Sequence, residues 1–185
     1  MPTEIEAKYK VASFTPIEKA LKTAGAIFLG THNQTDQFFD SPDSALRRAD
    51  KGLRLRIVRA VGGGKSCAEP CRPMLTFKGP RDKTAGLKIR MEIQTYIDAA
   101  GAIAEILKQM GFAPASVVRK RRASYRLGNC QVELDQLPHL GRFVEVEGPS
   151  QKSVRIVCRQ LGLTGEPITM PYVAMVAELA KGQAR

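Results

Sequence analysis

Charged residues recur at every second position in several short segments of this chain, and this period constrains its fold more than any other feature. In the segment TEIEAKYK, Glu4, Glu6, Lys8 and Lys10 alternate with less polar residues. Successive side chains of a β-strand point to opposite faces, so these four share one face at a spacing of about 6.7 Å. The pattern predicts a strand whose charged face either meets water or lines a polar interior.

The same alternation returns along the sequence, with Leu, Ile, Met or Val on the opposite face. The charged faces carry Arg54 and Arg56, then Lys78, then Lys88, Arg90 and Glu92, then Lys120 and Arg122, then Glu133 and Asp135, and finally Glu145 and Glu147. For any one strand, a solvated sheet face is the simpler interpretation. Over six or seven strands, the near absence of Ser, Thr and other neutral residues favours a closed barrel with these side chains inside.

Helical signals separate the strands in four places, within residues 13–26, 98–112, 150–163 and 171–180. Thr15 is expected as an N-cap that forms a capping box with Glu18, and Ser150 as the cap of the third helix. In the second helix the expected buried residues are Ile103, Ile106, Leu107 and Met110. A strand is expected at about residues 35–39. We find no repeat or linker, so the chain is predicted to form one α+β domain over residues 1–185, with about eight strands and four helices.

The chain has 29 Lys and Arg against 18 Asp and Glu, a net charge of +11. This excess predicts a polyanionic partner, which could be nucleic acid, a membrane surface or a phosphorylated small molecule. The basic run at residues 119–122 presents only Arg119 and Arg121 outward if it is a strand, which disfavours nucleic acid. No segment has the roughly 20 apolar residues of a membrane span, and the N-terminus has no apolar signal segment, so a cytoplasmic protein is expected.

The carboxylates gather in two Glu-x-Glu pairs, Glu4 with Glu6 and Glu145 with Glu147, and Asp135 belongs with them. Hard oxygen ligands of this kind suit Mg²⁺ or Mn²⁺, which also bind phosphate oxygens. Many cations beside a carboxylate-held metal are typical of an oligophosphate site. A positively charged lining of this kind would require a bound anion.

Other motifs carry less information. The segment GGGKS lacks the spacing of a phosphate-binding P-loop. His32 and His139 are isolated in the sequence, so neither is expected to bind a metal or act as a nucleophile. Cys67, Cys71, Cys130 and Cys158 are interpreted as free thiols, with a surface disulfide or metal clip as the alternative.

The segment EIEAK resembles the E-x-E-x-K signature of the CYTH superfamily, the triphosphate tunnel metalloenzymes. This superfamily includes class IV adenylate cyclases, thiamine triphosphatases and inorganic triphosphatases. Further similar segments follow in the family's order over about residues 2–180: TDQFFDSP, LRLRI, LTFKGP, IRMEI, VRKRRASYRL, VELDQLPHLGRFVEVEG and PYVAMVAEL. The resemblance implies a closed antiparallel eight-stranded β-barrel, a tunnel, with flanking helices.

The resemblance also implies roles for individual residues. The divalent cation would be held by Glu4, Glu6, Glu145 and Glu147, with Asp135 nearby. Phosphate oxygens would be bound by Lys8, Arg54, Arg56, Lys78, Lys88, Arg90, Lys120 and Arg122. Lys120 matches a lysine proposed as general base, and Lys8 is the second catalytic candidate. Glu92, Glu133 and Tyr172 are expected as further tunnel residues.

Three departures from the family pattern refine the expected function. Phe38 and Phe39 stand in a strand where the family commonly has a tyrosine, and Gln94 replaces a carboxylate. The His-Phe pair that precedes the signature in characterised cyclases is absent. We therefore predict hydrolysis of inorganic, thiamine or nucleoside triphosphate. The alternatives are a cyclase that makes cyclic AMP from ATP and a non-catalytic binder of polyphosphate or RNA. A homodimer is left open.

Overall fold

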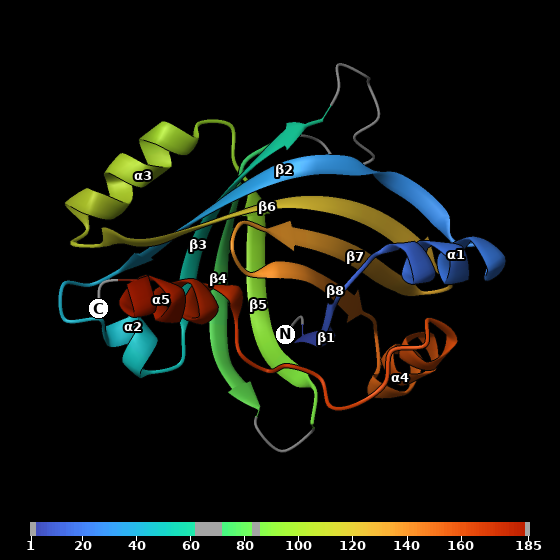
Figure 1. Cartoon of the computed structure of the whole chain (residues 1–185). Helices are drawn as coiled ribbons and strands as arrows, with labels where there is room; N and C mark the ends of the chain where they lie inside the picture. Colours follow the sequence, from blue (N-terminus) through green and yellow to red (C-terminus); the bar gives the residue numbers. More distant parts are fainter. Residues whose placement is uncertain (1–2, 62–71, 83–85, 184–185) are drawn as a thin grey trace.

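Eight antiparallel strands close into a barrel with helices around it (Figure 1). The computed structural model describes residues 3–61, 72–82 and 86–183. The strands are β1 (Thr3–Val11), β2 (Ile27–Asp40), β3 (Gly52–Ala60), β4 (Met74–Asp82), β5 (Lys88–Tyr96), β6 (Ala113–Leu127), β7 (Cys130–Leu137) and β8 (Gly141–Glu147). Their order around the barrel is β1-β5-β4-β3-β2-β6-β7-β8, and β8 pairs with β1 to close it. The predicted α+β fold with a closed eight-stranded barrel is confirmed.

The register places the charged faces of neighbouring strands on the same, inner side. Across β1 and β8, Glu6 lies opposite Glu147 and Lys8 opposite Glu145. Across β6 and β7, Arg122 lies opposite Asp135. Because side chains alternate along each strand, one such match fixes the orientation of the whole face. The charged residues therefore gather in the barrel interior, and the apolar residues between them face outward.

Most of the outward apolar residues are covered by helices α1 (Thr15–Thr23) and α4 (Gln151–Gln160). Val132, Val144 and Val146 of β7 and β8 are fully buried there against Val154 of α4. The predicted cap of α4 is confirmed, because the Ser150 hydroxyl accepts from the Ser153 backbone N–H in a capping box. This outer layer is the main hydrophobic core, and it leaves the barrel interior for polar residues.

The predicted start of α1 is wrong in detail. The N-cap is Phe14, which offers no side-chain hydrogen bond, and Thr15 is the first helical residue. The hydroxyl of Ser13 accepts from the Thr15 backbone N–H at 3.2 Å instead. The capping box expected between Thr15 and Glu18 is therefore absent, because the helix begins one residue earlier in the sequence than the pattern suggested.

Helix α3 (Ala100–Gln109) packs over β2 and β3, where Leu107 contacts the cluster around Phe39 and Leu55. The expected burial of Ile106 and Met110 is wrong, because they are 52% and 66% exposed. The helix instead turns toward the barrel a face that includes small alanines, which permits close packing on the sheet. The contacting residues are Ala100, Ile103, Ala104 and Leu107.

Two features of the chain after β1 were not predicted. Strand β2 runs over 14 residues instead of about five. A short fifth helix, α2 (Ala45–Arg48), follows it. The carboxylate of Asp40, at the end of β2, accepts from the backbone N–H groups of Leu46 at 2.9 Å and Arg47 at 3.0 Å. This anchor holds α2 at the rim of the barrel.

The last helix, α5 (Tyr172–Gln183), lies over the barrel interior. The segment that leads into it is tied to β1, because the backbone N–H of Ile168 donates to the carbonyl of Lys8 at 2.7 Å. Tyr172 then enters a second apolar cluster with Val118, Leu137 and Phe143. The start of α5 thus becomes part of the wall of the interior.

Three further predictions concern the cysteines, the GGGKS segment and membrane-spanning helices. Cys130 and Cys158 are buried free thiols, as predicted. Cys67, Cys71 and the GGGKS segment lie outside the described residues. Within the part of the chain that the structure describes, no helix has the length and apolar character needed to span a membrane.

Candidate active site

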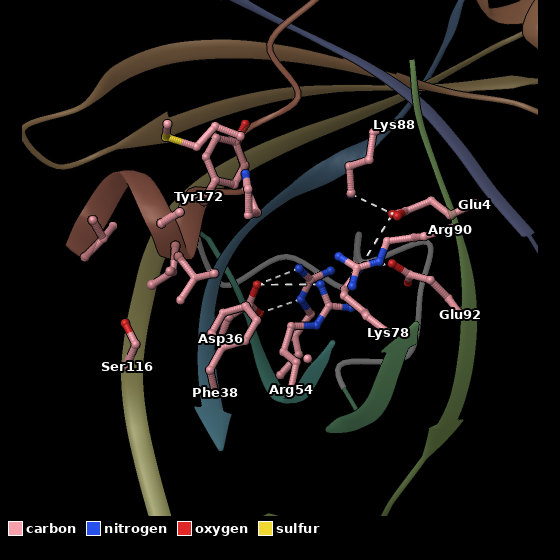
Figure 2. Close-up of a pocket in the computed structure, with 18 of the residues that line it drawn as sticks. Glu4, Asp36, Phe38, Arg54, Lys78, Lys88, Arg90, Glu92, Ser116 and Tyr172 are labelled. Atoms are coloured by element: carbon pink, nitrogen blue, oxygen red, sulfur yellow. Dashed lines mark hydrogen bonds and ion pairs between the residues drawn. The ribbon is translucent and has the colours of Figure 1, made fainter. Parts of the chain in front are cut away.

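The barrel encloses a cavity of about 1260 Å³, walled by inward side chains of the strands and by α5 (Figure 2). The structure brings nearly all predicted site residues to this cavity. The lining includes Glu4, Glu6, Lys8, Arg54, Arg56, Lys78, Lys88, Arg90, Glu92, Lys120, Arg122, Glu133, Glu145, Glu147 and Tyr172. Asp135 is fully buried behind this surface, where it contacts Lys120 and Arg122.

The wall formed by β6, β7 and β8 is a dense network of ion pairs. Asp135 accepts from Lys120 Nζ at 2.9 Å and from Arg122 Nε at 2.6 Å. Arg122 Nη2 also donates to Glu145 at 2.5 Å. Burial alone would lower the pKa of Arg122, but Asp135 and Glu133 raise it well above its ordinary value. We call this set, Lys120, Arg122, Glu133, Asp135 and Glu145, the Arg122 wall.

The opposite wall leaves one cation incompletely satisfied. Arg56 binds both oxygens of Asp36, at 2.6 and 2.7 Å. Arg54 shares that carboxylate only at 3.8 Å and donates to the Thr76 hydroxyl at 3.1 Å. Its Nε is buried without a hydrogen-bond partner among the residues described. Burial, and then repulsion from Arg56, lower the pKa of Arg54 to about 10.

Lysines of β4 and β5 continue this wall toward β1. Lys78 Nζ lies against Glu92 and 3.6 Å from Glu4. Burial, followed by repulsion from Arg54 and Lys88, holds the pKa of Lys78 well below its usual value. We call Arg54, Lys78 and Arg90 the Arg54 wall, and Figure 2 shows the three side chains converging on the open part of the cavity.

Lys88 and Arg90, in the same region, are each held by acceptors at close range. Lys88 Nζ sits between two carboxylates, 2.9 Å from Glu4 and 2.9 Å from Glu6. Arg90 Nε donates to the backbone carbonyl of Gly79 at 2.8 Å. The backbone at Gly79 is close-packed, since a Cβ there would meet Met91 at 3.3 Å. This carbonyl of β4 thus fixes the direction of the Arg90 guanidinium.

The lining is less one-sided in charge than the sequence suggested. Of the eight predicted phosphate-binding cations, seven lie within 4 Å of a carboxylate, and Arg90 contacts backbone carbonyls instead. The expectation that the lining would require a bound anion is therefore wrong, because acidic residues on adjacent strands neutralise most of it. A phosphate chain would have to compete with these carboxylates for the cations.

Carboxylates crowd together where β1 meets β8. Glu6 is buried, and its Oε1 has no hydrogen-bond partner within the described chain. Burial and repulsion from Glu145 raise the pKa of Glu6. Partial burial and the charges of Glu4 and Glu6 raise the pKa of Glu147 to about 7. Accumulated negative charge of this kind favours a bound cation.

These carboxylates have the donor chemistry that Mg²⁺ and Mn²⁺ prefer, and one buried oxygen is free to coordinate. Glu4, Glu6 and Glu147 therefore fit a divalent cation. No set of three potential ligands is already arranged around a metal position in the described residues. Glu145 and Asp135 fit less well, because their oxygens are engaged by Lys120 and Arg122.

The cavity residues of β2 that the sequence reasoning missed include His32, Gln34 and Asp36. A hydrogen bond of 2.8 Å joins His32 Nε2 and Gln34 Nε2. Burial, and then the charges of Arg122 and Arg56, lower the pKa of His32 to about 4. The period-two pattern extends backward from Phe38 through these positions, so it could have identified them had the strand been expected to begin earlier.

Tyr172 of α5 completes the lining above the Arg122 wall. Its ring centroid lies 4.3 Å from Lys8 Nζ and 5.0 Å from Lys120 Nζ. The ring also packs edge-on against Phe143, with centroids 5.2 Å apart. The two predicted catalytic lysines therefore lie close to the same aromatic side chain, which comes from outside the barrel strands.

The chain thus forms a closed antiparallel barrel, a tunnel whose interior is lined by paired cations and carboxylates. The family model for the CYTH domain matches residues 2–155, so the chain belongs to the CYTH family. This family contains triphosphatases and adenylate cyclases and depends in general on divalent metals. The predicted family is thereby confirmed.

Relatives and solved structures agree with this assignment. A Methanocaldococcus jannaschii protein, named as a candidate adenylate cyclase, is 30% identical over 78% of this chain and 75% of its own length. Adenylate cyclase CyaB of Aeromonas hydrophila is 26% identical over 77% of this chain and 67% of its length. A Pyrococcus horikoshii structure has a TM-score of 0.76 at 28% identity, covering 92% of this chain and 98% of that one.

A plant protein from Hippeastrum shares the fold at lower identity. Its TM-score is 0.70 at 20% identity, and the match covers 95% of each chain. That protein is described as a candidate adenylyl cyclase with a dominant triphosphatase activity. Names of both activities thus occur among the similar proteins.

Proposed function

We propose that this protein is a divalent-metal-dependent triphosphatase that binds the phosphate chain of its substrate in the barrel cavity. The main observation behind this proposal is that Arg54 is buried with incomplete hydrogen bonding. Its guanidinium is buried, faces the cavity and has an Nε without a partner among the described residues. Its pKa is lowered to about 10, so the fold holds this cation with too little negative charge around it. A phosphate oxygen would supply both the missing acceptor and the missing charge.

The neighbouring groups favour an extended anion over a single phosphate. Lys78 and Arg90 line the same cavity as Arg54, and burial, followed by repulsion from Arg54 and Lys88, lowers the pKa of Lys78. On the other side, Lys8 and Lys120 reach the cavity from β1 and β6. Cations on opposite walls can bind successive phosphoryl groups of one chain. Inorganic, thiamine and nucleoside triphosphates share this feature.

In this proposal a water oxygen adds to the terminal phosphorus, the P–O anhydride bond breaks, and orthophosphate leaves together with the diphosphate part. The water proton passes to Lys120 Nζ. Burial and the nearby Arg122 lower the pKa of Lys120, which favours the neutral amine that a base requires. Asp135, 2.9 Å from the amine, orients it.

Glu4, Glu6 and Glu147 would hold the divalent cation, and Glu145 adjoins them on β8. A bound Mg²⁺ or Mn²⁺ would supply Lewis-acid stabilisation of charge on the phosphate oxygens. Arg54, Arg56, Lys78, Lys88, Arg90 and Arg122 would bind non-reacting oxygens and neutralise charge in the transition state.

Cyclisation of ATP is the second candidate, and the names of the two curated relatives favour it. In that reaction the ribose 3′-hydroxyl attacks the α-phosphorus and pyrophosphate leaves. We prefer hydrolysis because the sequence contains no recognisable adenine-binding motif. The description of the Hippeastrum protein shows that a chain of this fold can bear a cyclase name and be described with triphosphatase activity.

Product analysis separates these activities. Purified protein is incubated with tripolyphosphate, ATP or thiamine triphosphate and Mg²⁺ or Mn²⁺, with EDTA as control, and orthophosphate, pyrophosphate and cyclic AMP are measured. We expect metal-dependent orthophosphate release. Cyclic AMP with pyrophosphate as the main products would contradict the hydrolase and support the cyclase. Tight binding without turnover of any of the three would indicate a binding module.

Lys120→Met tests the assigned base, with Arg119→Met as the matched control. The two residues are adjacent on β6, but Arg119 points outward and is exposed. We expect Lys120→Met to lower kcat by roughly 10²- to 10⁴-fold, the range for loss of a general base, and to weaken binding far less. Equal losses of rate and affinity would indicate that Lys120 binds phosphate and does not act as the base.

A further inference from the structure

The hydroxyl of Tyr172 is buried in the cavity without a partner. The residue is 9% exposed, and its Oη makes no hydrogen bond with any described residue. A buried hydroxyl that leaves water without gaining a partner costs free energy. A phenylalanine would pack against Phe143 equally well, so packing alone does not account for the hydroxyl.

The surroundings of this hydroxyl indicate what it would bind. The Tyr172 ring lies over Lys8 and Lys120, at 4.3 and 5.0 Å from their ammonium nitrogens. These lysines lie on strands β1 and β6, neither of which pairs with β3, the strand that carries Arg54. An anion held by the two lysines would lie beside the Tyr172 side chain. Figure 2 shows the Tyr172 ring beside the start of α5.

The ionisation state of Tyr172 makes it a donor. Burial, and then the carboxylates of Glu145 and Asp135, raise its pKa well above the ordinary value. The phenol is therefore protonated near neutral pH and can donate a hydrogen bond to an acceptor. Phosphate oxygens are acceptors only, so the two groups are complementary.

No other tyrosine among the described residues lines the cavity. Tyr9 and Tyr125 pack on the outside of the barrel, against the main hydrophobic core. On β2, the inward aromatic residue is Phe38, which has no hydroxyl. A phenolic donor can thus reach the cavity only from α5.

We propose that the Tyr172 hydroxyl donates a hydrogen bond to an oxygen of the phosphate chain bound by Lys8 and Lys120, which makes α5 part of the substrate site. This inference rests on the proposed function and assigns that site an additional binding residue. It also gives α5 a role beyond packing, because the helix places its first residue between the apolar cluster and the two lysines.

The test compares Tyr172→Phe with Tyr125→Phe. The first variant removes only the hydroxyl and retains the ring over the lysines. The second removes a hydroxyl from a tyrosine that packs against Phe28, outside the cavity, with ring centroids 5.1 Å apart. Tripolyphosphate is titrated calorimetrically into each protein at fixed ionic strength, and the melting temperature of each free protein is recorded.

We expect Tyr172→Phe to bind tripolyphosphate at least tenfold more weakly than the wild type, since hydrogen bonds to charged groups are worth that much or more. The free variant should melt at the same temperature or higher, because no hydrogen bond within the protein is lost. Tyr125→Phe should bind as the wild type does. Unchanged affinity of Tyr172→Phe would overturn the inference.

A measurement on the wild type keeps the inference testable if the variant folds poorly. Binding of tripolyphosphate should shift the ultraviolet difference spectrum of tyrosine to longer wavelength, as expected when a phenol begins to donate a hydrogen bond. Binding without such a shift would contradict a role for Tyr172. If the wild type does not bind tripolyphosphate at all, the proposed function itself fails, which is a separate outcome.

Discussion

Arg54 and Arg122 are both buried arginines of the barrel interior, yet the fold treats them in opposite ways. Arg122 is surrounded by three carboxylates, and its pKa is raised well above the ordinary value. Arg54 has a distant share of one carboxylate and an Nε without a partner within the described residues, and its pKa is lowered to about 10. Two arginines of the same barrel therefore differ in how far neighbouring carboxylates neutralise their charge.

The register explains the difference. Arg122 lies directly opposite Asp135 on the neighbouring strand, so a carboxylate meets it at close range. Arg54 lies opposite Phe38 on one side and Thr76 on the other, and its closest carboxylate, Asp36, is already bound by Arg56. We infer that the Arg122 wall mainly organises the barrel and that the Arg54 wall mainly receives the phosphate chain.

The largest expected effect is on stability, from Asp135→Asn. This change leaves Lys120 and Arg122 buried beside an amide that cannot balance their charge. Removing one partner of a buried ion pair typically costs about 3–5 kcal/mol of the free energy of unfolding. Urea unfolding of the free protein measures it. Asp43→Asn is the control, because it alters only exposed contacts, the pair with Arg48 and the hydrogen bond from the Ser41 hydroxyl, and should cost far less. Similar losses in the two variants would remove the distinction between the walls.

A smaller effect is expected on the pH dependence of the free energy of unfolding. It arises from His32, which lies opposite Arg122 across β2 and β6, where the potential is positive. Its pKa is about 4 in the folded protein against 6.5 ordinarily. The unfolded chain therefore takes up the proton first as the pH falls. The stability that neutral His32 contributes is present above pH 6.5 and is lost as the pH falls toward 4. Between pH 7.5 and 5 the loss should be about 2 kcal/mol.

The pH effect is isolated by comparing variants in urea unfolding at the two pH values. His32→Asn should lose that part of the pH dependence, whereas His139→Asn, which alters an exposed histidine, should retain it. An unchanged pH dependence in His32→Asn would mean that the cations nearby do not exclude the imidazolium. The Arg122 network would then be less positive at this point than proposed.

The smallest effect is on the stability of the free protein in Arg54→Met. A methionine of similar length removes a buried charge that has incomplete compensation, so the free energy of unfolding should change by no more than about 1 kcal/mol and can increase. Thermal unfolding without ligand checks this. A loss comparable to that of Asp135→Asn would show that Arg54 supports the fold as much as Arg122 does.

The barrel interior could be predicted from sequence because its cause is local. Strand parity alone places Glu6 and Lys8 on one face of their strand and Lys88 and Arg90 on one face of theirs, and no knowledge of distant contacts is needed. The outer helices were harder. The burial of Ile106 depended on how α3 rotates against the barrel, which is determined by packing with β2 and β3 and not by the helix itself.

The pairing inside the cavity could not be predicted, because it depends on the register between strands. Asp36 was quoted as part of a strand but was not recognised as a site residue, since its role comes from its position opposite Arg56. The same holds for Asp135, which was expected near a metal and whose oxygens contact Lys120 and Arg122. Its predicted role beside a metal remains a prediction.

The most direct test of the central claim is calorimetric titration of tripolyphosphate into the wild type, Arg54→Gln and Arg119→Gln at constant ionic strength. Arg119 is an exposed arginine on the outer face of β6, so both variants lose the same net charge. Binding of the wild type and of Arg119→Gln with similar affinity, and of Arg54→Gln roughly 10- to 100-fold more weakly, is the predicted result. Equal affinities in all three proteins, or no binding by the wild type, would contradict it.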